Sequence, residues 1–143
     1  MFIGEYQYNI DNKGRVAIPV KFRKILGKKA VITRGLDCCL FLFPVKEWET
    51  LAQKLVKLPL AKADSRAFVR LMLAGAVDIS IDSQGRILIP EYLRKYARLK
   101  KQVVFAGLYN RIELWDQHIW EQYKSKTESA SKEIAEKLGE LGI

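Results

Sequence analysis

Residues 10–24 read IDNKGRVAIPVKFRK, and residues 81–95 read IDSQGRILIPEYLRK. The two stretches lie 71 positions apart and share Ile, Asp, Gly, Arg, Ile, Pro, Arg and Lys at matching places. Further along, the offset becomes 72, so that Val31, Gly35, Leu42 and Trp48 meet Val103, Gly107, Leu114 and Trp120. We therefore interpret the chain as a tandem duplication of one module of about 45 residues.

The same order of elements is predicted in both copies. A strand (4–10; 76–81) leads through a hairpin turn to a second strand (15–18; 86–89). A proline then ends the strand and begins a short helix (20–26; 91–96), because proline at a helix start loses no needed N–H. Two further strands (30–33 with 39–43; 102–106 with 111–115) and a Trp-containing helix (44–55; 116 to about 126) complete each copy. The pattern predicts an α+β fold.

The duplication suggests domain boundaries. We expect one module over residues 5–47 and the second over 76–119. Residues 48–75 would form a helical connection, because their apolar residues recur at helical spacing without a Gly or Ser run. Residues 120–143 would form a C-terminal helix and a tail of marginal helicity. The two tryptophans, Trp48 and Trp120, are better explained as core anchors than as platforms for base stacking.

The turns in the repeat have a clear local chemistry. Asp11 and Asp82 open them, because an Asp side chain can accept hydrogen bonds from the backbone two residues on. Gly14 and Gly85 close them, because glycine accepts a positive φ. These four residues are therefore predicted to be structural, and the two aspartates are explained by turn chemistry rather than by acid–base catalysis.

Charge limits the choice of partner. The 143 residues carry 25 Lys and Arg against 16 Asp and Glu, a formal net charge of +9. This surplus favours a polyanion, either nucleic acid or an anionic membrane, although it could serve solubility alone. No apolar run approaches the roughly 20 residues needed to span a bilayer, and the N-terminus has no basic region typical of a signal peptide. We expect a cytoplasmic protein with no membrane partner.

Catalytic and metal-binding chemistry is poorly represented. The single histidine, His118, has no nucleophile near it in the sequence, and the adjacent Cys38 and Cys39 are interpreted as ordinary strand residues. A zinc site needs about four such ligands. We expect no metal, no cofactor, no small-molecule substrate and no enzymatic activity.

The arginines after the turns, Arg15 and Arg86, are the strongest candidates for binding. A guanidinium can bond guanine O6 and N7 together or clamp a phosphate. Each could instead form a structural ion pair with the Asp of its own turn, and the two roles are compatible. Further basic residues are candidate phosphate contacts: Lys13, Lys21, Arg23, Lys24, Arg94 and Lys95.

Since one module is too small to be stable alone, the two copies are expected to share a core. Their pairing would have pseudo-two-fold symmetry, which would match the dyad of DNA.

These motifs resemble a known family. MFIGEY at residues 1–6, Asp11-x-Lys13-Gly14-Arg15 and Ile18-Pro19 resemble the opening of the MraZ proteins, and Asp82-x-x-Gly85-Arg86 lies where that family has its second copy. The resemblance covers residues 1 to about 125. It implies AbrB-like (SpoVT-type) swapped-hairpin β-barrel modules that form an intramolecular pseudo-dimer with flanking helices.

The resemblance also implies a function. MraZ proteins are nucleoid-associated transcriptional regulators that recognise short direct repeats in double-stranded DNA, in the promoter of their own division and cell-wall operon. They act as ring-shaped homo-oligomers, and Arg15 and Arg86 match the family's DNA-contacting signature. This chain departs from symmetry at Gln84, which stands where the first copy has Lys13, so the second turn is less positive.

Three other classes compete with DNA binding. Antitoxins with AbrB-like barrels bind protein through a long disordered tail, whereas the tail here is short and helical in pattern. An RNA binder would expose aromatic residues on a sheet for base stacking, and none are evident. An enzyme is the least supported class.

Overall fold

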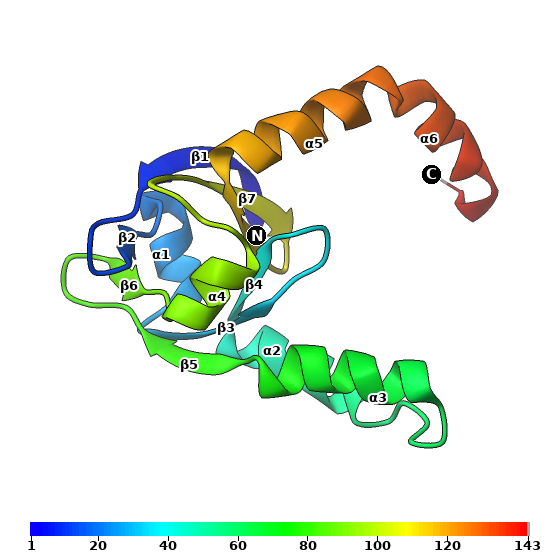
Figure 1. Cartoon of the computed structure of the whole chain (residues 1–143), viewed down its shortest axis with the longest axis horizontal. Helices are drawn as coiled ribbons and strands as arrows, with labels where there is room; N and C mark the ends of the chain where they lie inside the picture. Colours follow the sequence, from blue (N-terminus) through cyan, green and yellow to red (C-terminus); the bar gives the residue numbers. More distant parts are fainter. Residues whose placement is uncertain (143) are drawn as a thin grey trace.

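Strands from both copies are interleaved in two antiparallel sheets in the computed structural model, which describes residues 1–142 (Figure 1). The larger sheet has the order β1-β7-β8-β4-β3-β5, and the smaller one pairs β2 with β6. The strands are β1 (Phe2–Asn9), β2 (Arg15–Ala17), β3 (Lys29–Arg34), β4 (Leu40–Pro44), β5 (Val77–Ser80), β6 (Arg86–Leu88), β7 (Gln102–Tyr109) and β8 (Ile112–Asp116). The α+β fold class is confirmed.

The helices follow the duplication. The short helices α1 (Val20–Leu26) and α4 (Glu91–Tyr96) occupy the predicted residues. The Trp-containing helices are α2 (Val45–Leu55) and α5 (Gln117–Ser129). Between the copies, α3 (Ala63–Val69) continues into the π-helix η1 (Arg70–Ala74), and α6 (Ser131–Lys137) with the short η2 (Gly139–Leu141) follows α5. No helix within residues 1–142 is both long and apolar enough to cross a membrane.

Most strand pairs join one copy to the other. β1 pairs with β7, β5 with β3, β4 with β8 and β2 with β6. In the last pair, Val16 lies opposite Ile87, which is its own counterpart in the repeat, and Phe41 likewise lies opposite Glu113. The pairing is thus symmetric about these two positions. The strands on either side of each turn do not form the hairpin that the turn sequence indicated, because each of them pairs with a strand of the other copy instead.

Two local predictions near β3 and β4 are also wrong. The carbonyl of Lys28 accepts from Ile81 N, and the carbonyl of Lys101 accepts from Ile10 N. Since Ile10 and Ile81 are counterparts in the repeat, Lys28 and Lys101 are counterparts too. The two copies are therefore offset by 73 residues at β3, one more than the 72 that the sequence alignment indicates. The two cysteines precede β4 in a loop rather than lying in the strand. Cys38 has a φ of 72°, a left-handed conformation outside the extended range of a regular strand.

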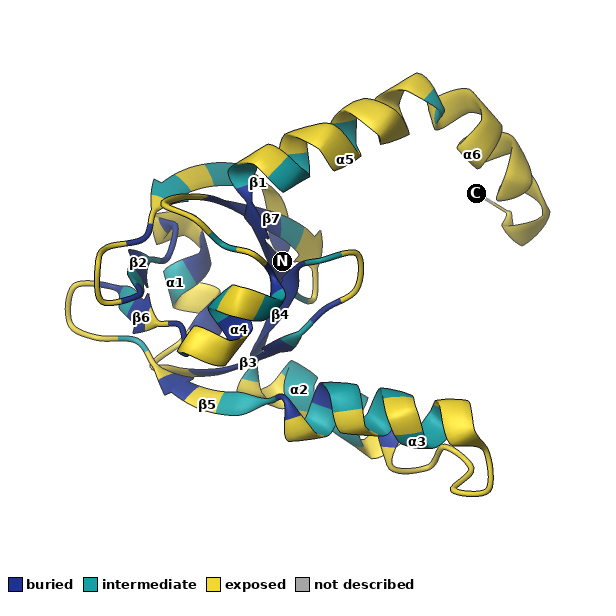
Figure 2. Cartoon of the chain, in the orientation of Figure 1, coloured by how far each residue is buried: buried dark blue, intermediate teal, exposed yellow. Residues whose placement is uncertain are grey.

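Two apolar clusters stabilise this arrangement, and both draw on both copies. The larger fills the interior between the sheets and includes Val16, Ile87, Leu42 and Leu114. The second lies under the outer helices, where the half-buried Trp48 and Trp120 pack against it, as predicted for core anchors. Figure 2 shows the buried strands at the centre and the largely exposed α5–α6 arm extending from them.

Because both clusters cross the boundary between the copies, we expect the chain to unfold as one cooperative unit. Leu42 and Leu114 are fully buried counterparts in the two copies. Leu42→Ala and Leu114→Ala should each lower the free energy of unfolding by about 2–5 kcal/mol. Urea unfolding followed by tryptophan fluorescence and by circular dichroism should give one coincident transition for both variants. Separate transitions, with each variant shifting only one, would contradict the shared core.

Candidate nucleic-acid interface

Each repeat turn is organised by its aspartate. Asp11 Oδ1 accepts from the N–H groups of Lys13 and Arg15, both at 2.9 Å, and Oδ2 accepts from Arg15 Nε at 3.0 Å. The second turn repeats this pattern, with Arg86 Nε 3.0 Å from Asp82 Oδ2. The closing glycines have φ values of 86° and 76°, which a side chain would strain. The turn therefore fixes the direction in which its arginine leaves the backbone.

These hydrogen bonds favour the charged carboxylates. The backbone N–H of Arg15 is the main cause that lowers the pKa of Asp11, and the backbone N–H of Arg86 does the same for Asp82. The arginine side chains are about a third exposed, 35% for Arg15 and 33% for Arg86. Ion pairs this open to water add little to stability. Their main effect is to orient the guanidinium groups.

The two arginines share the outward face of the β2–β6 ribbon. Val16 and Ile87 are each 1% exposed and point into the core. Side chains alternate along a strand, so Arg15 and Arg86 point to the opposite face, together with Ala17 and Leu88. Arg15 lies opposite Leu88 and is therefore a diagonal neighbour of Arg86, with a backbone separation of roughly 7–8 Å. Since each Asp engages Nε, the Nη groups are available to another acceptor.

A second pair of arginines packs against the turns of the opposite copies. Arg23 Nε donates to Ile18 O at 2.8 Å, and a Cβ on Gly85 would lie only 2.4 Å from the Arg23 guanidinium carbon. Arg94 lies against Gly14 in the same way, because a Cβ on Gly14 would lie 2.8 Å from the Arg94 guanidinium carbon. The sequence predicted Arg23 and Arg94 only as phosphate contacts. It missed their packing on the turns, because that contact depends on how the copies pair.

The remaining predicted cations differ in their surroundings. Lys13, Lys24 and Lys95 are all exposed, Lys13 in the first turn and the other two on α1 and α4. Lys95 Nζ lies 3.5 Å from Glu91 Oε1, whereas the counterpart of Glu91 in the first copy is Val20. The turn positions and the helix positions are therefore both more positive in the first copy.

Two lysines that sequence reasoning did not select also lie beside the turns. Lys101 O accepts from Ile10 N at 2.7 Å, next to the first turn, and Lys28 O accepts from Ile81 N at 2.9 Å, next to the second. A signal was present in the sequence, because each copy has a pair of adjacent lysines at the start of this strand, Lys28-Lys29 and Lys100-Lys101. Figure 1 places the loops next to β2 and β6 at one end of the molecule, with α3 and α6 directed away from them.

Other chemistries find little support in the same residues. Within residues 1–142, no three His, Cys, Asp or Glu side chains gather as a metal-binding group. Burial is the main cause that raises the pKa of the Cys39 thiol, which keeps it protonated and unreactive.

Comparison with known proteins identifies relatives over the full chain. A family model described as "MraZ protein, putative antitoxin-like" matches residues 1–71 and again 72–140. Proteins named "Transcriptional regulator MraZ" from Caldanaerobacter subterraneus subsp. tengcongensis and Clostridium tetani are each 50% identical over 143 residues, covering all of both chains. One of the same name from Pelotomaculum thermopropionicum is 52% identical over 143 residues, which is all of this chain and 99% of that one.

The turn chemistry predicts a specific dependence of stability on pH. A folded-state pKa below the ordinary 3.8 means that Asp11 and Asp82 stabilise the fold above that pH, and that this contribution is lost as pH falls through the lowered value. The double variant Asp11→Asn/Asp82→Asn should be less stable than the wild type at neutral pH, with the difference shrinking below about pH 4. Urea midpoints measured from pH 7 to pH 2 test this, with Glu136→Gln on the exposed α6 as the control. A difference that stays constant down to pH 2 would rule out the assigned role.

Proposed function

The chain belongs to the MraZ family, and on that premise we propose that it is a sequence-specific DNA-binding transcriptional regulator whose β2–β6 ribbon reads DNA. One observation carries the proposal most directly. Two arginines from equivalent positions stand on the outward face of one two-stranded ribbon, each oriented by the aspartate of its own turn. The names of the relatives agree with this function.

The ribbon has the dimensions and chemistry for direct readout. The major groove of B-DNA admits a two-stranded β-ribbon, and an arginine can donate two hydrogen bonds to guanine O6 and N7. Holding Nε on an aspartate reduces the freedom that the side chain loses on binding. Opposite the arginines on the same face of the ribbon, Leu88 and Ala17 offer apolar contacts suited to a thymine methyl group.

Phosphate contacts would supply affinity and register. We assign this role to Lys13, Lys24 and Lys95, and to the guanidinium Nη groups of Arg23 and Arg94, which lie beside the turns. The two halves are unequal, because Gln84 replaces Lys13 and Glu91 partly neutralises Lys95. The first copy therefore contributes more to binding, and the second less.

The architecture proposed with this function is a pair of AbrB-like swapped-hairpin modules that form a pseudo-dimer within one chain. The exchange of strands between the copies, symmetric about Val16 and Ile87, supports it. The proposed modules span 5–47 and 76–119, joined by the helical connection 48–75 and followed by the helix and tail 120–143. The target proposed from the family resemblance is a set of short direct repeats in the promoter of the protein's own division and cell-wall operon, and the proposed location is the nucleoid.

Self-association into a ring is the last part of the proposal. The chain exposes large apolar side chains away from the turns, among them Leu60 at 83%, Leu141 at 71% and Tyr109 at 70%. Exposed apolar groups of this kind are typical of contacts between subunits. A ring would bring several ribbons to successive repeats and convert modest single contacts into avidity.

A protein-binding role of antitoxin type is the alternative that the family description favours. Such a role relies on a tail that wraps the partner, whereas residues 117–137 here form α5 and α6. A pull-down of protein partners with and without residues 126–143 separates the two roles, because only the antitoxin role needs the tail.

Replacement of the ribbon arginines tests base reading. Arg15→Ala and Arg86→Ala should each weaken binding to the promoter repeats by about 1–3 kcal/mol while leaving binding to scrambled DNA little changed. Fluorescence anisotropy on the two duplexes measures both quantities. Arg70→Ala in η1 removes the same charge at an exposed position of the helical connection and should bind like the wild type. A folded Arg15→Ala protein with unchanged preference for the repeats would refute the assignment.

The oligomer and the repeats can be tested together. Native mass spectrometry should give the mass of an oligomer, a whole multiple of the 16.5 kDa chain greater than one. A duplex with two repeats should bind at least about 100-fold more tightly than a duplex with one, because the second contact becomes intramolecular. The control is a duplex in which the second repeat is scrambled at the same length. A monomer in solution, or equal affinity for one repeat and two, would argue against the ring.

A further inference from the structure

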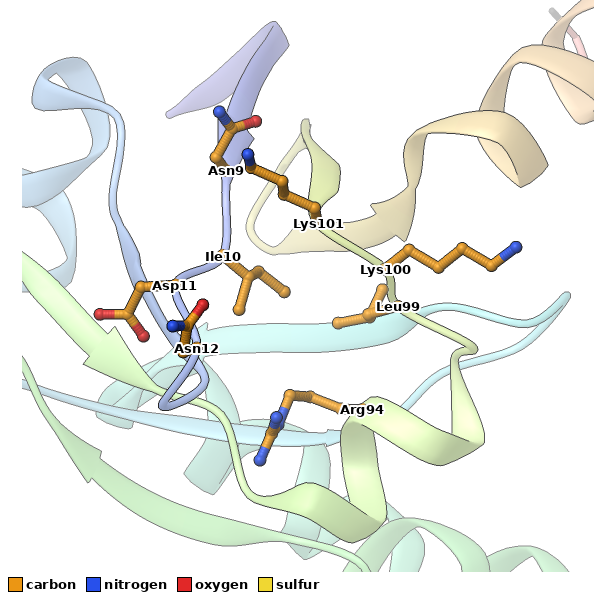
Figure 3. A pocket seen from close by; sticks show the side chains of 8 residues that line it. All are labelled: Asn9, Ile10, Asp11, Asn12, Arg94, Leu99, Lys100 and Lys101. Atoms are coloured by element: carbon orange, nitrogen blue, oxygen red, sulfur yellow. The ribbon is translucent and has the colours of Figure 1, made fainter.

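A basic hollow of about 530 Å³ lies beside the first turn, at the junction of β1, α4 and β7 (Figure 3). Three cations line it, Arg94, Lys100 and Lys101, together with the exposed amides of Asn9 and Asn12. The one carboxylate in the lining, that of Asp11, is already bonded to Arg15. The hollow is therefore positive, because Asp11 pairs with Arg15 and leaves the charges of Arg94, Lys100 and Lys101 without compensation from that carboxylate.

The side chains around the hollow approach it from different elements. In Figure 3, Lys101 is directed toward Asn9 at the end of β1, and Arg94 reaches toward the turn from α4. Lys100 extends in the other direction, away from the turn. Lys101 and Asn9 are thus the groups that lie side by side in the hollow, whereas the Arg94 guanidinium is directed to its other end, toward the turn.

The backbone that carries the lysines is fixed on both sides. Lys101 O accepts from Ile10 N at 2.7 Å, and Lys100 N donates to Asp116 Oδ1 at 3.1 Å. Leu99 N donates to Arg94 O at 2.9 Å, which closes the end of α4. The segment between α4 and β7 is therefore held in place before any ligand binds, while the Lys101 side chain remains exposed.

We propose that this hollow binds a phosphate of the DNA backbone, next to the base-reading ribbon. The inference rests on the proposed function, since it takes DNA as the ligand. Three cations and two amides line this hollow, and its single carboxylate is engaged by Arg15, so the lining has the charge that an anionic ligand needs. Lysine, arginine and asparagine side chains are common donors to phosphate oxygens in protein–DNA contacts.

The repeat supplies a matching position beside the second turn. Lys28 O accepts from Ile81 N at 2.9 Å, as Lys101 O does from Ile10 N. Arg23 Nε donates to Ile18 O at 2.8 Å, as Arg94 Nε does to Ile89 O at 3.0 Å. Lys28 and Lys101 therefore form a symmetric pair that flanks the ribbon, each anchored by its backbone to the turn of the other copy.

The test is the salt dependence of DNA binding by the full chain with Lys28→Gln/Lys101→Gln. Both side chains are exposed and only their backbone takes part in the fold, so folding should be preserved. The slope of log affinity against log salt concentration should become shallower by about 0.9 for each phosphate that the variant no longer neutralises. When salt is raised from 50 to 200 mM, both proteins should lose affinity, and the factor lost by the wild type should be about ten times the factor lost by the variant if two phosphate contacts are removed. The change should be equal on promoter and scrambled duplexes, because phosphates carry no sequence information.

The matched control is Lys54→Gln/Lys57→Gln, which removes the same charge from exposed lysines at the end of α2. A slope that changes no more in the Lys28/Lys101 variant than in this control would overturn the inference, as would weaker binding confined to promoter DNA. Failure of the proposed function gives a different result, because the wild type would then show no preference for promoter over scrambled DNA. The salt slopes on the scrambled duplex still decide the lysine contacts in that case.

Discussion

The exchange of backbone hydrogen bonds between the two copies is the constraint on which the remaining structure depends. β2 and β6 have three residues each, too few to form a stable sheet alone. They persist because Val16 and Ile87 are buried beneath them, and because Ile18 N donates to Gly85 O at 2.8 Å in the other copy's turn. Buried backbone groups must find partners, and here much of that pairing comes from the other half of the chain. This exchange between the copies determines the positions of the β2–β6 ribbon, of its two arginines and of the flanking lysines Lys28 and Lys101.

Local chemistry made much of the fold predictable. The Asp and Gly positions of each turn, the prolines before α1 and α4, and the apolar periodicity all act over a few residues, so the sequence located these elements closely. Pairing between distant strands has no local signal, so the turn sequence indicated a hairpin although its two strands pair with the other copy. The left-handed conformation of Cys38, a residue type that seldom adopts it, likewise escaped prediction. Arg15 and Arg86 could be chosen because the repeat marks them, whereas the packing of Arg23 and Arg94 on the turns appears only once the copies are placed together.

The Asp–Arg pairs show why exposed ion pairs can matter without adding much stability. A pair that is a third exposed gains little from its charge, because water screens it. Two backbone N–H groups nevertheless fix the carboxylate, and the carboxylate in turn restricts the guanidinium. The arginine is held by one nitrogen and keeps its other donors for a ligand. The same residues therefore serve the turn and the proposed interface, which explains why a structural and a binding role for Arg15 do not exclude each other.

Placing both halves of the symmetric unit in one chain has a consequence that a dimer of identical chains lacks. Identical subunits must present the same side chain at both equivalent positions, whereas a duplicated chain can change one copy alone. Three such changes lie near the proposed interface: Lys13 against Gln84, Ala17 against Leu88, and Val20 against Glu91. Each leaves the strand exchange intact, because none of these side chains belongs to the shared core. The backbone of the ribbon thus stays symmetric while its surface does not. An asymmetric surface suits DNA sites arranged as direct repeats, which have a direction, better than a palindrome, which has none.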